Sequence, residues 1–307
     1  MCRTLSDLKK CDLSVFLGNV QVKERISLWL DQGRLPHSLL ITSPDGCGRG
    51  FLARTIAAAW LEDTNGLVAR NQHPDCLTAT GEGASGLIPI KQIREILFEL
   101  HKSPVMTDGH RICLLDDVNR LTPNTANALL KILEEPPEGT VFILCARHAG
   151  NLIETIRSRS IIVTVNPLGV SECLDASKQI YPDYDPERLA RLCQTYGGRL
   201  GLVRKTLEIP GRLEIYDHAG RFTESALRGD KLDAMAAMDP YASLKTREDF
   251  KQLLFISSLM LLEHPLSGTM ASRATHLYDL IVDTISQVDR YINPKILAAW
   301  LATGLFA

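Results

Sequence analysis

The fold is indicated first by residues 39–62, LLITSPDGCGRGFLARTIAAAWLE. Residues 39–42 are a mainly apolar run with the length of a buried strand. The turn formers Ser43-Pro44-Asp45-Gly46-Cys47-Gly48 follow, and a helix-like stretch then extends from about Arg49 to Glu62. The order of strand, glycine-rich loop and helix predicts the beginning of an α/β domain.

Two more strands and a helix are predicted further along the chain. Residues 112–115 indicate a second buried strand, which ends in two acidic residues, and residues 141–145 indicate a third. Between them, Thr122 is a suitable N-cap and Pro123 a suitable first helical residue for a helix through Leu133, which Pro136-Pro137 stops. Strands that alternate with helices favour a parallel sheet.

Strand signals fade after about residue 166, and the rest of the chain has apolar residues at helical spacing. The strongest breaks in this part are Gly197-Gly198 and Ile209-Pro210-Gly211. We therefore predict three domains: an α/β domain over residues 1–166, a small helical domain over 167–208 and an all-helical domain over 209–307.

Composition excludes several classes of protein. The 307 residues carry 34 Lys and Arg against 36 Asp and Glu, for a formal charge of −2, so no global positive field favours DNA or a membrane. The eight cysteines contain no C-x-x-C pair, which argues against a zinc site and favours reduced core cysteines. With no apolar stretch of membrane-spanning length, we expect a cytoplasmic protein.

The loop at residues 43–50 corresponds to a phosphate-binding loop with its chemistry altered. In the pattern G-x-x-x-x-G-K-S/T the glycines let backbone N–H groups face phosphates, Lys contacts the terminal oxygens and the hydroxyl binds magnesium. Here Gly46 and Gly48 still permit the turn at a helix N-terminus, but Arg49 replaces the Lys and Gly50 the hydroxyl residue. These four residues predict a degenerate nucleotide site.

Asp116 and Asp117 close the second strand in the position of a Walker B segment. There the first carboxylate serves magnesium and the second, normally Glu, polarises water. Asp117 is one methylene shorter than Glu, and this chemistry demands accurate geometry. Two roles therefore stay open for the pair, namely a part in the nucleotide site or capping of the following turn.

Other segments carry a specific resemblance. They are ANALLKILEEPP at 126–137, RLPHSLL at 34–40 and TIRSRS at 155–160. In order and spacing over residues 13–165, the chain closely resembles the clamp-loader subunits of the AAA+ family. The resemblance implies that the three predicted domains are an AAA+ P-loop domain, a helical lid and a C-terminal oligomerisation collar.

Within this family the resemblance implies a subunit without its own ATPase activity. The sensor 1 position corresponds to Ala146 and the sensor 2 region to Leu202, so both lack the polar groups of active relatives. Arg159 corresponds to an arginine finger that acts in trans on nucleotide bound by a neighbouring subunit. The four-cysteine zinc module of many members is missing, because the corresponding interval contains only Cys76. We therefore expect no zinc and no resident nucleotide.

The implied function is that of a non-hydrolysing stator of the DNA polymerase III clamp loader in DNA replication. Its expected partners are the other loader subunits, gamma/tau and delta, together with the sliding clamp and primer–template DNA through the assembled complex. No membrane partner is expected. The alternative is a catalytically active, gamma/tau-like AAA+ ATPase with an unusual loop.

Overall fold

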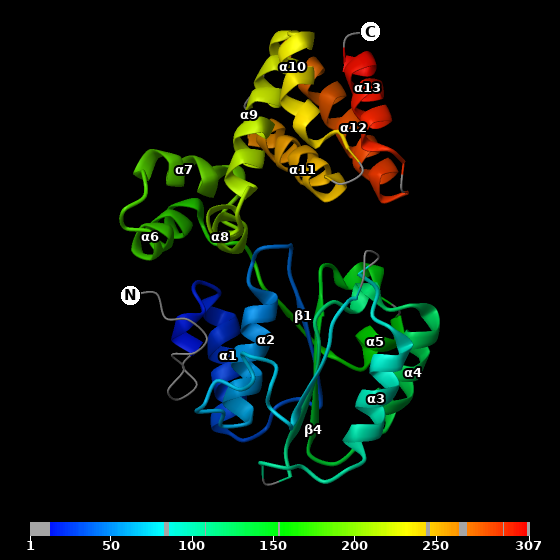
Figure 1. Cartoon of the computed structure of the whole chain (residues 1–307). Coiled ribbons are helices and arrows are strands. Elements are labelled where there is room, and N and C mark those ends of the chain that lie inside the picture. The colour runs from blue at the N-terminus through cyan, green and yellow to red at the C-terminus, as the bar shows by residue number, and fades with distance from the viewer. Residues whose placement is uncertain are drawn as a thin grey trace. The chain divides into compact units, whose positions relative to one another are not determined.

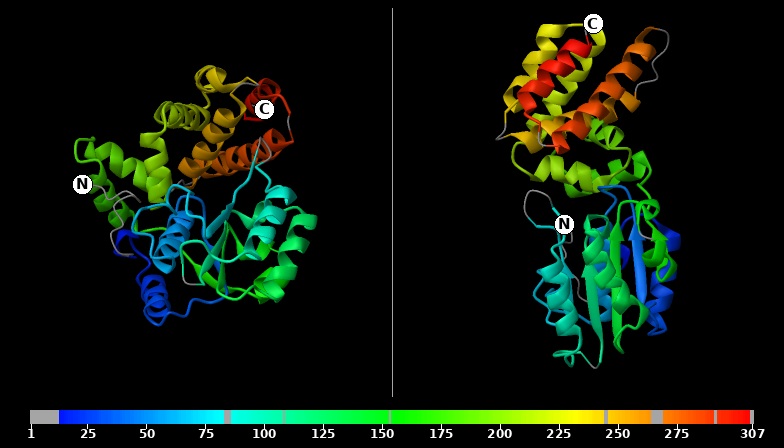
Figure 2. Two further views of the ribbon diagram at one scale, coloured as in Figure 1. Left: turned by 60° about the horizontal axis from the view of Figure 1, so that its bottom comes forward. Right: turned by 90° about the vertical axis from the view of Figure 1, so that its right-hand side faces the viewer.

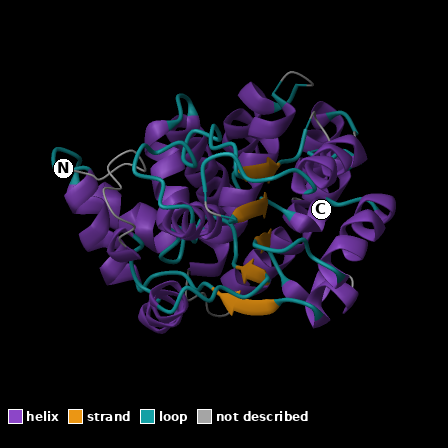
Figure 3. Ribbon diagram, turned by 90° about the horizontal axis from the view of Figure 1, so that it is seen from below, coloured by secondary structure: helices purple, strands orange, loops and turns teal. Residues whose placement is uncertain are grey.

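Five parallel strands form the centre of the first part of the chain. The computed structural model describes residues 13–82, 86–107, 109–152, 154–243, 246–263, 269–290 and 292–305. In chain order the strands are β1 (Ser38–Thr42), β2 (Cys76–Ala79), β3 (Arg111–Leu115), β4 (Thr140–Ala146) and β5 (Ile161–Thr164). Their order in the sheet is β2-β3-β4-β1-β5, and every pairing is parallel. Figure 3 shows these strands as one column.

Helices cover both faces of this sheet (Figure 1). Helices α1 (Val20–Asp31) and α2 (Arg49–Trp60) lie on one face, and α3 (Ile90–Leu100), α4 (Pro123–Glu134) and α5 (Glu154–Ser158) lie on the other. Each layer of helices has its own hydrophobic core against the sheet. The result is the three-layer α/β architecture that the sequence predicts.

Strand β1 divides its side chains between the two cores. Leu39 and Ile41 pack with α1 and α2, whereas Leu40 packs with α3 and α4. This alternation follows from the two-residue period of a strand, and all five residues are buried because β1 is an interior strand of a sheet whose two faces are both covered by helices. A continuous apolar run is therefore the expected sequence of this strand.

The predicted elements agree with the observed ones to within two residues. The strands predicted at 39–42, 112–115 and 141–145 are β1, β3 and β4, and the helix after the loop is α2. Thr122 caps α4 as predicted, because its hydroxyl accepts a hydrogen bond from the Thr125 N–H at 3.2 Å. The four-residue strands β2 and β5, at the two edges of the sheet, are not among the predicted elements.

The rest of the described chain is helical. The helices are α6 (Val170–Ile180), α7 (Pro186–Thr195), α8 (Leu200–Glu208), α9 (Arg212–Arg228), α10 (Lys231–Met238), α11 (Arg247–Glu263), α12 (Thr269–Asp289) and α13 (Pro294–Leu305). The chain divides into two compact units: the first extends to Asp183 and includes Gly198–Gly201, and the second comprises Tyr184–Gly197 and the residues from Leu202 onward. The boundary passes through the region predicted as a lid, and the three-domain division stays a prediction.

The second unit has its own hydrophobic core. Figure 2 shows α9 to α13 packed as a helical bundle, in which Phe222, Phe250 and Leu277 are fully buried. A polar cluster joins α7, α9 and α11, since the Thr195 hydroxyl lies 3.0 Å from the Tyr216 hydroxyl and 3.3 Å from Glu263 Oε2. Burial raises the pKa of Glu263 to about 7. No helix in the described residues is long and apolar enough to span a bilayer.

A short segment at residues 198–201, which includes the first two residues of α8, belongs to the first unit. The Gly201 N–H donates to the Gly46 carbonyl at 2.8 Å, and the Leu168 N–H donates to the Gly198 carbonyl at 3.2 Å. Gly198 has a φ of +76°, and a Cβ there would lie 1.9 Å from the Leu168 carbonyl oxygen. Glycine is therefore required at position 198 by both conformation and space.

We predict that Gly198→Ala destabilises the protein more than Gly197→Ala. Both residues have a positive φ, which costs a non-glycine residue roughly 1–2 kcal/mol. At Gly197, however, a Cβ would meet nothing within 4 Å, so this variant isolates the conformational cost from the backbone clash. The melting temperatures of the two variants test this difference, and equal losses would contradict it.

Candidate functional site

The loop between β1 and α2 has the shape of a phosphate-binding loop. Gly46 and Gly48 have φ values of +88° and +87°, in the left-handed region that favours glycine. A Cβ at Gly48 would also lie 3.1 Å from the Phe16 ring. Arg49 is the first residue of α2, so the loop leads directly into a helix N-terminus. The predicted strand, loop and helix are therefore present, and the loop keeps the required turn.

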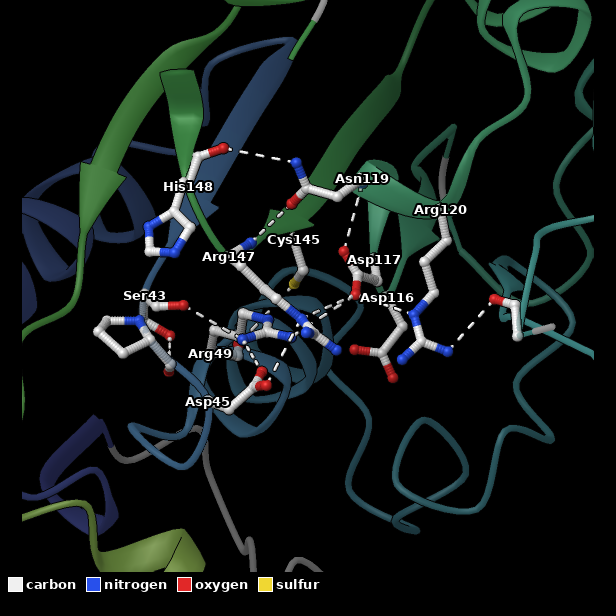
Figure 4. Close-up of polar contacts among 12 residues, drawn as sticks. Ser43, Asp45, Arg49, Asp116, Asp117, Asn119, Arg120, Cys145, Arg147 and His148 are labelled. Carbon is white, nitrogen blue, oxygen red and sulfur yellow. Dashed lines mark hydrogen bonds and ion pairs between the residues drawn. The ribbon is translucent and has the colours of Figure 1, made fainter. Parts of the chain in front are cut away.

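The guanidinium of Arg49 pairs with acidic side chains of its own chain (Figure 4). Its Nη1 lies 2.9 Å from Asp45 Oδ1 and donates to the Ser43 carbonyl at 3.2 Å, while Nη2 lies 3.9 Å from Asp117 Oδ2. Only 14% of the side chain is exposed. The guanidinium therefore folds back over its own loop, where it neutralises the carboxylates on either side.

The two acids after β3 have different surroundings. Asp116 is 37% exposed and pairs with Arg54 Nη2 at 3.5 Å. Asp117 is 11% exposed and faces Arg120 Nε at 3.2 Å and Arg147 Nε at 3.6 Å, as well as Arg49. Asp117 also accepts a hydrogen bond from the Asn119 N–H at 3.3 Å, which caps the short helix η3 (Val118–Arg120). Of the two roles left open by the sequence, this geometry favours capping for Asp117.

These residues do not fit a magnesium-bound nucleotide. Position 50 offers no hydroxyl, and a Cβ there would lie 3.1 Å from Asp116 Oδ1 and 3.2 Å from Arg54 Nη1. Binding of a phosphate by Arg49 would require this side chain to leave Asp45. Among the described residues, no group of three or more His, Cys, Asp or Glu side chains forms a metal cluster.

The thiols beside the loop are held in the neutral form. Cys145 lies beneath α2, with its sulfur 3.9 Å from the Arg49 carbonyl, and burial raises the pKa of this thiol to about 12. Cys47, within the loop, is half-buried; burial also raises the pKa of its thiol, while the charges of Arg199 and Arg49 lower it. Cys2 and Cys11 lie outside the described residues.

The two predicted sensor positions carry no polar side chain. Ala146, the sensor 1 position, is the last residue of β4 and is completely buried, and Leu202 on α8 is also buried. The predicted site residues do not include Asp45, Arg54, Arg120 or Arg147, which complete the charge network with Arg49, Asp116 and Asp117. Two of these pairs, Asp45–Arg49 and Asp117–Arg120, have the i,i+4 and i,i+3 spacings that could have indicated them.

Arg159 lies near the end of the sheet at which β1 begins, opposite the end that carries the loop. The hydroxyls of Ser160 and Ser38 are 2.8 Å apart, which places the residue after Arg159 beside the first residue of β1. The phosphate loop follows the last residue of this strand, about 13 Å away at the usual rise of roughly 3.3 Å per residue. Arg159 is 35% exposed, and its Nη2 lies 2.8 Å from Glu134 Oε1. The structure therefore does not bring Arg159 together with the chain's own loop.

Comparison with known proteins agrees with this architecture. A gamma subunit-related protein of DNA polymerase III from Thermotoga maritima superposes with a TM-score of 0.59 at 19% identity, covering 92% of this chain and 98% of that one. This similarity concerns the fold alone. The α/β unit with its five-stranded parallel sheet and the helical part of the chain thus share the fold of this gamma subunit-related protein, in agreement with the predicted fold class.

The sequence comparisons are more specific. Residues 18–169 match the sequence model of the family described as "DNA polymerase III, delta subunit". The delta-prime subunit of Pseudomonas aeruginosa is 29% identical over 56% of this chain, and that of Yersinia pestis is 34% identical over 41%. The chain covers 57% and 41% of the lengths of these two relatives. Over residues 18–169, just under half of its length, the chain is therefore similar to this family of DNA polymerase III subunits.

We predict that Asp117→Asn destabilises the protein more than Asp116→Asn. The amide removes the negative charge that faces three guanidinium groups in a mostly buried position, and we expect a loss of about 1–3 kcal/mol in unfolding free energy. Asp116 is more exposed and meets one arginine in the network, so Asp116→Asn should lower the free energy of unfolding by less than about 1 kcal/mol. Urea unfolding measures both, and a larger loss for Asp116→Asn would contradict the assignment.

Proposed function

We propose that this chain is a delta-prime-like subunit of a DNA polymerase III clamp loader that does not hydrolyse ATP itself. It acts as a stator and supplies Arg159 to an ATPase site on a neighbouring subunit. In this way it helps the loader place a sliding clamp on primed DNA during replication. The observation that carries the proposal is the ion pairing of Arg49 with Asp45 inside a loop that keeps its phosphate-binding shape.

The absence of ATPase activity is supported by the same network. The side chains that would face phosphate and magnesium, Arg49 and Asp116, are paired with charges of this chain, and Gly50 has no hydroxyl. The buried Ala146 provides no polar group to orient an attacking water. Hydrolysis requires positioning and charge stabilisation together, and this loop provides neither.

The trans role of Arg159 is supported by its position. Because it lies near the edge of the sheet opposite the loop, it is better placed to meet nucleotide held by another subunit than its own. A guanidinium at such an interface would stabilise the negative charge that develops on the transferring phosphoryl group. The partly exposed side chain remains accessible for this contact.

The partners we propose are the gamma/tau and delta subunits, and through the assembled loader the sliding clamp and primer–template DNA. The helical unit would form the collar that joins the subunits. Several large apolar side chains on this unit are exposed, among them Leu232, Ile296 and Trp300, which is typical of a surface that packs against another protein. The cytoplasm is the compartment that this role implies.

The rival function is an active gamma/tau-like ATPase. The fold does not distinguish the two, since the similar Thermotoga maritima protein is described as gamma subunit-related. The residues at positions 49, 50 and 146 favour the stator, because an active site needs a phosphate-binding Lys, a magnesium-binding hydroxyl and a polar sensor at those places.

We predict that Arg159→Ala lowers DNA- and clamp-stimulated ATP hydrolysis by a reconstituted loader while leaving the protein folded and assembled. An arginine finger contributes about 10³ to 10⁵ in rate at a single site, but the other sites of the ring keep their own, so we expect roughly a 2- to 10-fold overall loss. Clamp loading, which needs all sites to act together, should fall further.

Arg157→Ala is the matched control, because Arg157 is an exposed arginine on α5, two residues earlier. It should leave hydrolysis and clamp loading close to those of the unmodified loader. Equal losses from the two variants would show that removal of any positive charge in this region lowers the rate, which contradicts a specific role for Arg159. Full activity of the Arg159→Ala loader would refute the proposed trans role.

A further inference from the structure

Arg159 is held by two groups of its own chain. Its Nη2 lies 2.8 Å from Glu134 Oε1, and its Nη1 donates to the Thr155 carbonyl at 3.3 Å. Glu134 is the last residue of α4, Thr155 lies on α5, and Arg159 follows the end of α5 directly. The guanidinium is therefore fixed at both terminal nitrogens by two adjacent helices.

The ion pair is not explained by stability. The side chain of Glu134 is 50% exposed and that of Arg159 is 35% exposed, and ion pairs at such positions add little to the stability of a fold. What the pair does restrict is the orientation of a long, flexible side chain. A pre-oriented guanidinium loses less conformational freedom when it forms its next contact.

The contacts leave the arginine able to bind a further anion. A guanidinium has five N–H donors in a planar fork, and the bonds to Glu134 and Thr155 occupy two of them. Within the described part of the chain the other donors have no partner, so they can meet a phosphate, which offers several acceptor oxygens. Glu134 and a phosphate can thus bind different N–H groups of the same fork at the same time.

We propose that Glu134 is a positioning residue for Arg159, and this inference rests on the trans role proposed above. The carboxylate holds the guanidinium, together with the Thr155 carbonyl, in the orientation that presents its remaining N–H groups to a phosphate bound by the neighbouring subunit. The ion pair between Glu134 and Arg159 is exposed to solvent and therefore weaker than a bond from the same guanidinium to a phosphate in a buried interface. Glu134 therefore does not prevent Arg159 from binding that phosphate.

The test uses the reconstituted loader with Glu134→Ala, Glu134→Gln or Arg159→Ala, and with the double variant Glu134→Ala/Arg159→Ala. We expect Glu134→Ala to lower kcat for ATP hydrolysis about 2- to 5-fold with little change in KM. A poorly oriented guanidinium stabilises the transition state less, whereas binding of ATP in the ground state changes little. Glu134→Gln should retain most of the rate, since its amide oxygen can still accept the Nη2 hydrogen bond.

The double variant gives the decisive comparison. If Glu134 acts through Arg159, the double variant should be no slower than Arg159→Ala alone, because the second change then has nothing left to orient. Glu135→Ala is the matched control, since Glu135 is the exposed glutamate that follows, and it should leave the rate unchanged.

The outcomes separate the two proposals. A normal rate for Arg159→Ala would overturn the trans role and this inference with it. A slow Arg159→Ala loader combined with an unchanged or faster Glu134→Ala loader would overturn only the positioning role, as would additive losses in the double variant. Each loader is first checked for complete assembly by gel filtration, so that a failure to assemble is not read as a slow rate.

Discussion

The ion pairing of Arg49 with Asp45 and Asp117 is the constraint on which the rest of this site depends. It lies at the carboxyl edge of the sheet, between the loop that follows β1 and the turn that follows β3 (Figure 4). In a phosphate-binding loop the anion that neutralises the basic residue comes from the ligand. Here it comes from the chain, so the loop is electrostatically complete without nucleotide.

The same network connects elements that are distant in sequence. Asp117 faces Arg147, which follows β4, and Arg120, the last residue of η3, as well as Arg49, and the Gly201 N–H binds the loop carbonyl of Gly46. These contacts join the loop, the turn after β3 and the start of α8 within one unit. These contacts hold the loop in place without a ligand, which is consistent with the proposed role of a subunit that does not hydrolyse ATP.

The sequence predicted the central elements of the fold and the degraded loop, for physical reasons that are visible in the structure. The runs at β1, β3 and β4 are continuous and apolar because these strands are buried on both faces, and Thr122-Pro123 marks a helix start by local hydrogen bonding alone. Strand β5 was missed because it lies at the edge of the sheet and three of its four residues are exposed. Arg54 and Arg147 were missed because their partners are distant in sequence and meet them only in the folded chain.

The charges of the loop are satisfied within the chain, and we propose that they leave no site for nucleotide. Isothermal titration calorimetry of the full chain with magnesium–ATP decides between this proposal and an active nucleotide site. We expect no saturable binding up to millimolar nucleotide, in the presence or absence of magnesium. Stoichiometric binding with a micromolar Kd that strengthens when magnesium is added would contradict this proposal. Such binding requires Arg49 to leave Asp45 and Asp116 to leave Arg54 in order to contact the ligand.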